Sequence, residues 1–321
     1  MRVLIVRLSA LGDVLTGLHA LSTLRARDSS TFIGWLVEDR FANLLEGHPQ
    51  LDRVHVYPRK HKRRIPAFLK ELRRERYDLA LDLQGNLKSG ALTWLSGARR
   101  SAGLDRPFSR EGNHLLLDEL VAPPPGHRVD GYLALIDSVC GPGPHATGFL
   151  PAQPSEQGAI VLHPGVSRFG AFKRWPSGHF AELGDRLERR LEAPVLLTAG
   201  PGEHEDALEV QRQMQQPARI AETPSLRDLV NLLAGARLVV AADTGPAHIA
   251  AAVGAPTLTL FGPKDPDIMA PRGSRAGAVS ARVRCSPCPF RTCPDPVCMT
   301  SLEVDLVESR ALALLEAGAR E

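Results

Sequence analysis

The chain has 321 residues, more than the ~100–200 residues of a usual single domain, so we expect two domains. Its 43% hydrophobic and 23% charged residues are typical of a globular protein and argue against disorder away from the termini. A net charge of +3 is too small to indicate a nucleic-acid-binding protein, so no nucleic acid partner is expected.

The first half alternates short apolar runs with helix-period stretches. The first run, residues 3–6, is too brief for a signal peptide or a membrane span, so we expect a cytoplasmic protein. Further runs follow at residues 32–37, 54–56 and 79–83, with helical patterns between them. This alternation predicts a parallel sheet covered by helices on both faces.

Prolines and glycines crowd residues 122–154, which marks a linker, and a second alternation of strands and helices begins at residue 160. The sequence therefore predicts an α/β protein with two doubly wound, Rossmann-like domains, residues 1–150 and 151–300, facing an interdomain cleft. Residues 301–321 are predicted to form an amphipathic C-terminal helix that packs back on the N-terminal domain.

Three motifs carry candidate chemistry. Gly12 and Asp13 stand where the first strand runs into a helix, so Asp13 is either a helix-capping residue or a general base. Lys173 follows the first strand of the second domain and is either a surface charge or a phosphate ligand. The stretch from Asp243 to His248 joins a strand to a helix whose exposed N–H groups and dipole suit a diphosphate.

Four of the five cysteines, Cys285, Cys288, Cys293 and Cys298, lie within 14 residues among several prolines. In a cytoplasmic chain this spacing predicts a structural zinc or iron site before disulfides or free thiols. Four thiolates leave no open coordination position, and no Asp-x-Asp motif stands at a strand end, so we expect no cofactor for catalysis.

Taken together, these motifs resemble glycosyltransferase family 9, which contains the ADP-heptose:lipopolysaccharide heptosyltransferases, and most closely its heptosyltransferase I members. The resemblance rests on Gly12-Asp13, on the stretch from Asp82 to Ser89, on Lys173-Arg174-Trp175-Pro176 and on Asp243 to His248, in that order along the chain. It implies a GT-B fold and an inverting, metal-independent transfer of heptose from ADP-L-glycero-D-manno-heptose to a Kdo-containing inner-core acceptor.

The resemblance also implies roles for individual residues. Asp13 and Lys173 would be catalytic. The donor would be bound by Gly12, Glu203, Asp243, Thr244, Gly245 and His248. The acceptor, a Kdo-lipid A type molecule, would be bound by Arg59, Lys60, Lys62, Arg63, Arg64, Gln84, Lys88 and Arg110.

The basic run from Arg59 to Arg64 suits the carboxylates and phosphates of such an acceptor. Phe68, Leu69 and Leu72 follow it and form a basic amphipathic stretch expected to make peripheral contact with the cytoplasmic face of the inner membrane. Alternatives remain open at this point: a GT-B relative that transfers another sugar, heptosylates a protein or epimerises a nucleotide sugar, a non-catalytic sugar-nucleotide binder, or a metal-stabilised scaffold without turnover.

Overall fold

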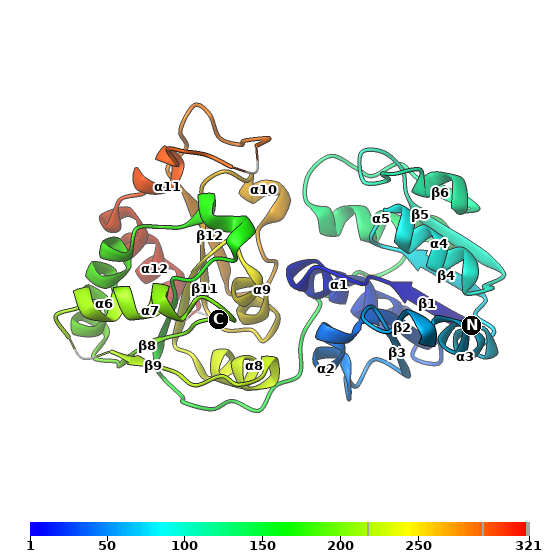
Figure 1. Cartoon of the computed structure of the whole chain (residues 1–321), viewed down its shortest axis with the longest axis horizontal. Coiled ribbons are helices and arrows are strands. Elements are labelled where there is room, and N and C mark those ends of the chain that lie inside the picture. The colour runs from blue at the N-terminus through cyan, green and yellow to red at the C-terminus, as the bar shows by residue number, and fades with distance from the viewer. Residues whose placement is uncertain (217, 291, 319–321) are drawn as a thin grey trace. The chain divides into compact units, whose positions relative to one another are not determined.

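The computed structural model describes residues 1–216, 218–290 and 292–318, and the chain divides into two compact units, Met1–Pro151 and Ala152–Glu321 (Figure 1). The sequence analysis placed the boundary after residue 150, in the linker rich in proline and glycine. Each unit contains one six-stranded parallel sheet, so the expected class of two doubly wound α/β domains is confirmed.

The N-terminal sheet has the strand order β3-β2-β1-β4-β5-β6. Its order reverses between β1 and β4, which is the topological switch point where doubly wound sheets bind ligands. The strands are β1 (Arg2–Val6), β2 (Phe32–Glu38), β3 (Arg53–Tyr57), β4 (Leu79–Asp82), β5 (Arg100–Leu104) and β6 (Glu119–Val121).

Helices cover both faces of this sheet. Leu36 packs with residues of α3 and α4, while its neighbour Trp35 contacts Gly17 of α1; successive strand residues point to opposite faces, so these helices lie on opposite sides. Helix α5 packs against α1. The helices are α1 (Leu11–Arg27), α2 (Ala42–Leu45), α3 (Ile65–Arg74), α4 (Leu87–Leu95) and α5 (Arg128–Cys140), with 3-10 turns η1 (Asp39–Phe41), η2 (Lys62–Arg64) and η3 (Asn113–Leu116).

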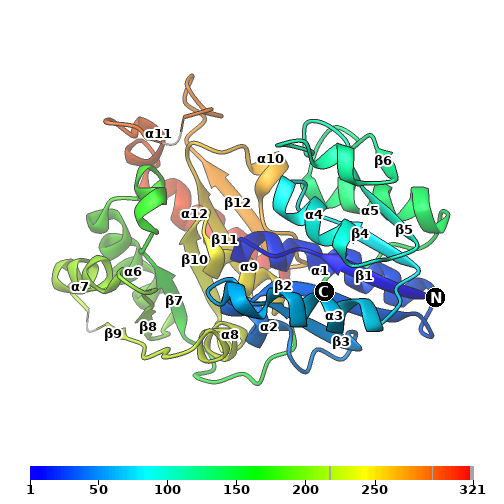
Figure 2. The ribbon, with the colours of Figure 1, turned by 45° about the vertical axis from the view of Figure 1, so that its right-hand side comes forward.

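The C-terminal sheet repeats the same winding, with the order β12-β11-β10-β7-β8-β9 and its switch point between β7 and β10. Figure 2 shows β7, β10, β11 and β12 running side by side. The strands are β7 (Ile160–His163), β8 (Val195–Leu197), β9 (Arg219–Ile220), β10 (Leu238–Ala242), β11 (Thr257–Phe261) and β12 (Ala276–Ser280).

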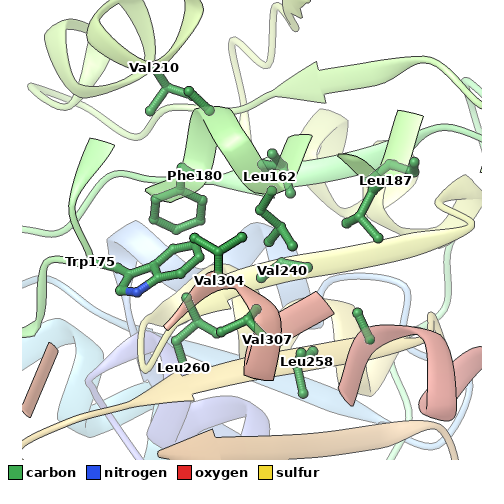
Figure 3. Packing of buried hydrophobic residues seen from close by; sticks show 14 of the residues in the cluster. Leu162, Trp175, Phe180, Leu187, Val210, Val240, Leu258, Leu260, Val304 and Val307 are labelled. Atoms are coloured by element: carbon green, nitrogen blue, oxygen red, sulfur yellow. The ribbon is translucent and has the colours of Figure 1, made fainter. Parts of the chain in front are cut away.

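The main core of this unit lies between the sheet and helices α6, α7 and α12. Leu162, Val240 and Leu260 on the strands meet Trp175 and Phe180 there (Figure 3). Helices α8 and α9 pack together, and α9 also packs on β10 and β11. The bounds are η4 (Arg168–Lys173), α6 (Ser177–Leu191), α7 (His204–Gln213), α8 (Leu226–Gly235), α9 (Gly245–Ala252), α10 (Pro266–Met269), α11 (Val297–Thr300) and α12 (Val304–Gly318).

The C-terminal helix α12 belongs to the second unit, and its expected packing on the N-terminal domain stays a prediction. Val304 and Val307 on its buried face lie in the core with Trp175 (Figure 3), as does Ala311. The indole N–H of Trp175 donates to the Leu302 carbonyl at 2.8 Å. The predicted helix is confirmed from residue 304, and residues 319–321 lie outside the described part. Among the helices of that part, none is long and apolar enough to cross a membrane.

Candidate active site

Polar side chains gather at the switch point of the N-terminal sheet. Val6, at the end of β1, is paired with Asp82, at the end of β4. Arg7 follows β1 directly, and Asp13 lies in the first turn of α1. Because the carboxyl ends of β1 and β4 meet at this edge, the chain brings these charged groups together within one unit.

Asp13 has two kinds of partner. Its carboxylate accepts a hydrogen bond from the Ala10 amide at 3.2 Å, which is a capping interaction, although Ala10 and not Asp13 is the N-cap residue. The same carboxylate forms ion pairs with Arg7 at 2.7 Å and with Arg128 of α5. Helix capping therefore accounts for only part of the environment of Asp13.

Neither arginine was among the candidate residues of the sequence analysis. Arg7 had a sequence signal, since a charged residue directly after a buried apolar run stands at the ligand-binding edge of the sheet. Arg128 had none, because it follows the linker prolines and meets Asp13 only through the packing of α5 on α1.

Asp82 organises the loop after β4. Its buried carboxylate accepts hydrogen bonds from the amides of Gln84 at 2.8 Å and Gly85 at 3.1 Å, and from the side chains of Ser89 at 2.7 Å and Asn113 at 2.6 Å. Burial raises the pKa of Asp82, and these hydrogen bonds oppose that rise. The carboxyl group thus fixes the loop and the start of α4.

Gln84 was predicted to bind the acceptor, and the structure shows a second role for it. Its side-chain oxygen accepts hydrogen bonds from the amides of Leu8 at 2.8 Å and Ser9 at 3.3 Å, which tie the loop after β1 to the loop after β4. Gly85 has a positive φ of 74° and leaves no space for a side chain, because an added Cβ would lie 2.3 Å from the Phe108 carbonyl oxygen.

Two of the predicted acceptor residues meet at Glu38, the last residue of β2. The Lys88 ammonium lies 2.7 Å from its carboxylate, the Arg40 guanidinium 2.9 Å and the Arg59 Nε 3.8 Å. Glu38 is only 2% exposed, whereas all three basic side chains are more than 40% exposed. One buried carboxylate therefore holds three cations at the surface with a net positive charge.

The other predicted acceptor residues, Lys60, Lys62, Arg63, Arg64 and Arg110, are exposed. The apolar residues after the basic run do not form a membrane-facing surface: Phe68 and Leu72 are buried in the N-terminal core, because α3 uses its apolar face to cover the sheet. The expected amphipathic membrane-contact stretch is therefore wrong for these two side chains.

The carboxyl edge of the C-terminal sheet holds the predicted donor residues except Gly12, which lies in the first turn of α1 in the N-terminal unit. Lys173, at the end of η4, donates from its ammonium to the Asp243 carboxylate at 2.5 Å and to the Asp243 carbonyl at 3.0 Å. His248 lies 3.8 Å from the same carboxylate. Burial raises the pKa of Asp243, but the nearby His248 and the Lys173 ammonium outweigh it, so the pKa of that carboxyl is lowered.

Helix α9 begins at this cluster. Thr244 is its N-cap residue, Gly245 is the first helical residue and Pro246 follows. In the described part of the chain the Thr244 hydroxyl makes no capping bond and donates to the Ala242 carbonyl at 3.1 Å. The first-turn amides are thus free of a side-chain cap beside the Lys173 ammonium, an arrangement suited to an anion.

Glu203 lies at the N-cap position of α7, close to the same edge of the sheet. Its carboxylate accepts from the Gly200 amide at 2.9 Å and lies 3.3 Å from His163, the last residue of β7. Burial raises the pKa of Glu203, but His163 and the Gly200 amide outweigh it, so the pKa is lowered. The side chain is held ionised at the carboxyl end of the sheet, where a hydroxyl-rich ligand would meet an acceptor of hydrogen bonds.

The four clustered cysteines line one small cavity of about 30 Å³, together with Phe172 and Pro263. Burial and the neighbouring thiols raise the pKa of Cys298. All four are free thiols, and within residues 1–216, 218–290 and 292–318 no group of three or more potential ligands is spaced to hold a metal ion. The thiol donors suit zinc or iron, but their spacing here is not that of a metal-bound set, so the structural metal stays a prediction.

The chain is similar to known proteins in both sequence and structure. The model of glycosyltransferase family 9 (heptosyltransferase) matches residues 65–298. The lipopolysaccharide heptosyltransferase 1 of Pseudomonas aeruginosa is 30% identical, with 98% of each chain covered. Two structures of the E. coli heptosyltransferase WaaC, one with ADP and one with ADP-2-deoxy-2-fluoro heptose, are 27% identical and superpose with TM-scores of 0.81 and 0.78.

These two structures cover 98% and 97% of this chain and all of their own length, so the likeness extends through both units. The two doubly wound sheets and the WaaC likeness show a GT-B fold. The chain belongs to glycosyltransferase family 9 and is a glycosyltransferase, similar to heptosyltransferase 1 enzymes.

Proposed function

We propose that this protein transfers heptose from ADP-L-glycero-D-manno-heptose to a Kdo-containing acceptor of the lipopolysaccharide inner core, with inversion at the anomeric carbon and without a metal ion in the chemistry. The observation that carries the proposal is the Lys173–Asp243–His248 cluster at the start of α9, in a chain 27% identical to an enzyme seen with ADP and with an ADP-heptose analogue. The names of the similar enzymes support the lipopolysaccharide core as the acceptor.

The diphosphate of the donor meets positive charge and N–H groups in this assignment. Asp243 holds the Lys173 ammonium beside the first turn of α9, and the amides of that turn complete an anion site with the helix dipole. Lys173 and His248 then stabilise the charge that develops on the leaving ADP, the work that a divalent cation does in other transferases. Glu203 accepts hydrogen bonds from the ribose hydroxyls.

Asp13 is the general base in this proposal. The acceptor hydroxyl oxygen forms a bond to the anomeric carbon as the bond from that carbon to the β-phosphate oxygen breaks. The hydroxyl proton passes to the Asp13 carboxylate, and the electron pair of the broken bond leaves with ADP. Attack opposite to the leaving group inverts the anomeric centre, and Gly12, next to Asp13 in the first turn of α1, has no side chain that would hinder the donor.

The acceptor carries carboxylates and phosphates, and the N-terminal unit offers cations for them. Arg59 and Lys88 are held by Glu38, while Lys62, Arg63 and Arg64 stand exposed on η2. Such a basic surface suits a cytoplasmic enzyme that works at the anionic inner face of the membrane, with peripheral contact made by these charges and not by the buried apolar face of α3.

A donor comparison tests this function. ADP-heptose, UDP-sugars and GDP-sugars are each added to the purified full-length protein, and unfolding temperature is measured alongside ADP release with and without Kdo-lipid A. We expect ADP-heptose alone to raise the unfolding temperature, since binding to the native state stabilises it, and ADP release to require the acceptor. A preference for a UDP- or GDP-sugar would overturn the donor assignment, and release without dependence on Kdo-lipid A would overturn the acceptor assignment.

A further inference from the structure

The ion pairs of Asp13 involve two arginines in different settings. Arg7 is 4% exposed, and its guanidinium also donates to the Leu83 carbonyl, so it is a fixed part of the sheet edge. Arg128 is 23% exposed and begins α5. A positive charge in the first turn of a helix is opposed by the helix dipole, so Arg128 occupies a position that helix stability alone disfavours.

Buried donors around this carboxylate lack partners. The Nε atoms of Arg7 and Arg128 and the hydroxyl of Tyr132 form no hydrogen bond with any residue that the structure describes. Tyr132 is 1% exposed and lies one helical turn after Arg128. Burial raises its pKa, and the charges of Arg7 and Arg128 act against that rise, so the hydroxyl lies within electrostatic reach of both. Unpaired buried donors cost free energy, which an oxygen-rich ligand would recover.

The two ion pairs also weaken Asp13 as a base. A carboxylate between two guanidinium groups holds its charge strongly and accepts a proton poorly. One of the two pairs must loosen before Asp13 can take a proton from a hydroxyl at a useful rate. Arg128 is the group able to do so, because it is the more exposed of the two and has a buried Nε–H without a partner among the described residues.

We propose that Arg128 binds the carboxylate of the acidic sugar acceptor and that this contact draws it away from Asp13, so that the base becomes active only when a carboxylate-bearing acceptor is present. A sugar carboxylate matches the guanidinium fork in a bidentate manner and replaces Asp13 as its partner. Tyr132 donates its hydroxyl to the same carboxylate. This inference rests on the proposed function, since it takes Asp13 as the base.

Arg7 after β1 and Arg128 on α5 form ion pairs with Asp13, Tyr132 on α5 lies within electrostatic reach of all three, and Asp82 at the end of β4 lies within electrostatic reach of Arg7 and Tyr132. Only Arg128 is proposed to move on acceptor binding. In the free enzyme the positive charge of Arg128 beside Asp13 favours the ionised carboxylate, and in the acceptor complex that effect is lost. The acid limb of kcat, which reports the complex, should therefore lie at higher pH than the acid limb of kcat/KM, which reports the free enzyme.

The test compares Arg128→Met with wild type on a Kdo-containing lipid A acceptor and on its methyl ester, which keeps the hydroxyl and loses the carboxylate. Arg99→Met removes an exposed charge of the same unit and serves as the control. We expect Arg128→Met to raise KM for the carboxylate acceptor by about 10- to 100-fold, to change KM for the ester less than about threefold, and to bring the two acid limbs together. Arg99→Met should leave all three quantities unchanged.

A variant that keeps wild-type preference for the carboxylate and the wild-type separation of the acid limbs would overturn the proposal and leave Arg128 as a structural tie between α5 and α1. If Arg128→Met does not fold, Arg128→Lys and Arg128→Gln answer the same question, since neither has the guanidinium fork. A normal rate in Asp13→Asn would instead mean that the proposed function itself has the wrong base, so the two failures are separate.

Discussion

Replacing Lys173 with methionine should destabilise the C-terminal unit as well as weaken ADP binding. The Lys173 ammonium lies 2.5 Å from the Asp243 carboxylate, with the two side chains 20% and 9% exposed. Removing one partner of a buried pair costs ~3–5 kcal/mol. The cost has an upper limit, because the unpaired Asp243 carboxylate can take up a proton. Protonating a carboxyl with an ordinary pKa of 3.8 at pH 7 costs about 4 kcal/mol at about 1.36 kcal/mol per pKa unit.

His248, 3.8 Å from the same carboxylate, lowers the cost further by remaining as a second partner. We therefore expect a loss of about 2–4 kcal/mol, and an unfolding temperature lower by about 4–16 °C at ~2–4 °C per kcal/mol for a unit of this size. Methionine keeps the aliphatic stem of lysine, so the change isolates the charge.

The assay is urea and thermal unfolding of the full chain, with and without ADP. Asp243→Asn and the double variant complete a cycle, in which the double variant should regain part of the loss because no unpaired buried charge remains. Arg189→Met on α6, where the side chain is exposed, is the matched control and should stay within about 0.5 kcal/mol of wild type. If Lys173→Met also stays within about 0.5 kcal/mol of wild type, and ADP raises its unfolding temperature as much as that of wild type, both the buried ion pair and its place in the donor site are refuted.

Three further predictions concern other parts of the chain. Neutralising Arg63 and Arg64 should raise the acceptor KM and reduce its dependence on salt while leaving ADP affinity unchanged. An effect on ADP affinity alone would contradict their assignment to acceptor binding. Burial lowers the pKa of His55 from 6.5 to about 4, so the imidazole is neutral in the folded protein between these pH values, whereas it is protonated in the unfolded chain. The free energy of unfolding should therefore fall by up to about 3 kcal/mol as the pH drops from 6.5 to 4. His55→Gln should flatten this acid limb of stability, measured by urea unfolding, and an unchanged limb would contradict the assignment. Elemental analysis of anaerobically purified protein should find about one zinc or iron per chain. The Cys288→Ser variant should lose both the metal and thermal stability. If the protein contains no metal and the variant unfolds at the wild-type temperature, the four cysteines are ordinary thiols.

The doubly wound units were predictable because their strands are buried on both faces and so appear as continuous apolar runs, as residues 160–162 and 238–241 do. The approach of Lys173, Asp243 and His248 follows from the same pattern, since η4 follows β7 and Asp243 follows β10, and the carboxyl ends of β7 and β10 are neighbours. Residues that follow two paired parallel strands lie close together at the carboxyl edge of the sheet, even when they are far apart along the chain.

Other features depend on packing that sequence patterns do not encode. The apolar spacing of α12 predicts a buried face but not which core receives it, and Val307 proved to lie in the C-terminal core. The Asp13–Arg128 pair joins residues 115 positions apart through the contact of α5 with α1, and no local pattern indicates that contact. Glu38 had a signal, as a carboxylate at the end of a buried strand, but its three cations come from separate segments.

The central claim is that Asp13 accepts the proton of the acceptor hydroxyl during heptose transfer. The most direct measurement follows heptosylated Kdo-lipid A by mass spectrometry, with wild type and Asp13→Asn supplied with ADP-heptose. We expect one ADP released per heptose transferred by wild type, and turnover lower by ~10²-fold or more in Asp13→Asn with ADP affinity unchanged. Wild-type turnover in Asp13→Asn, or no heptosylated product from a wild-type protein that binds ADP-heptose, would contradict it.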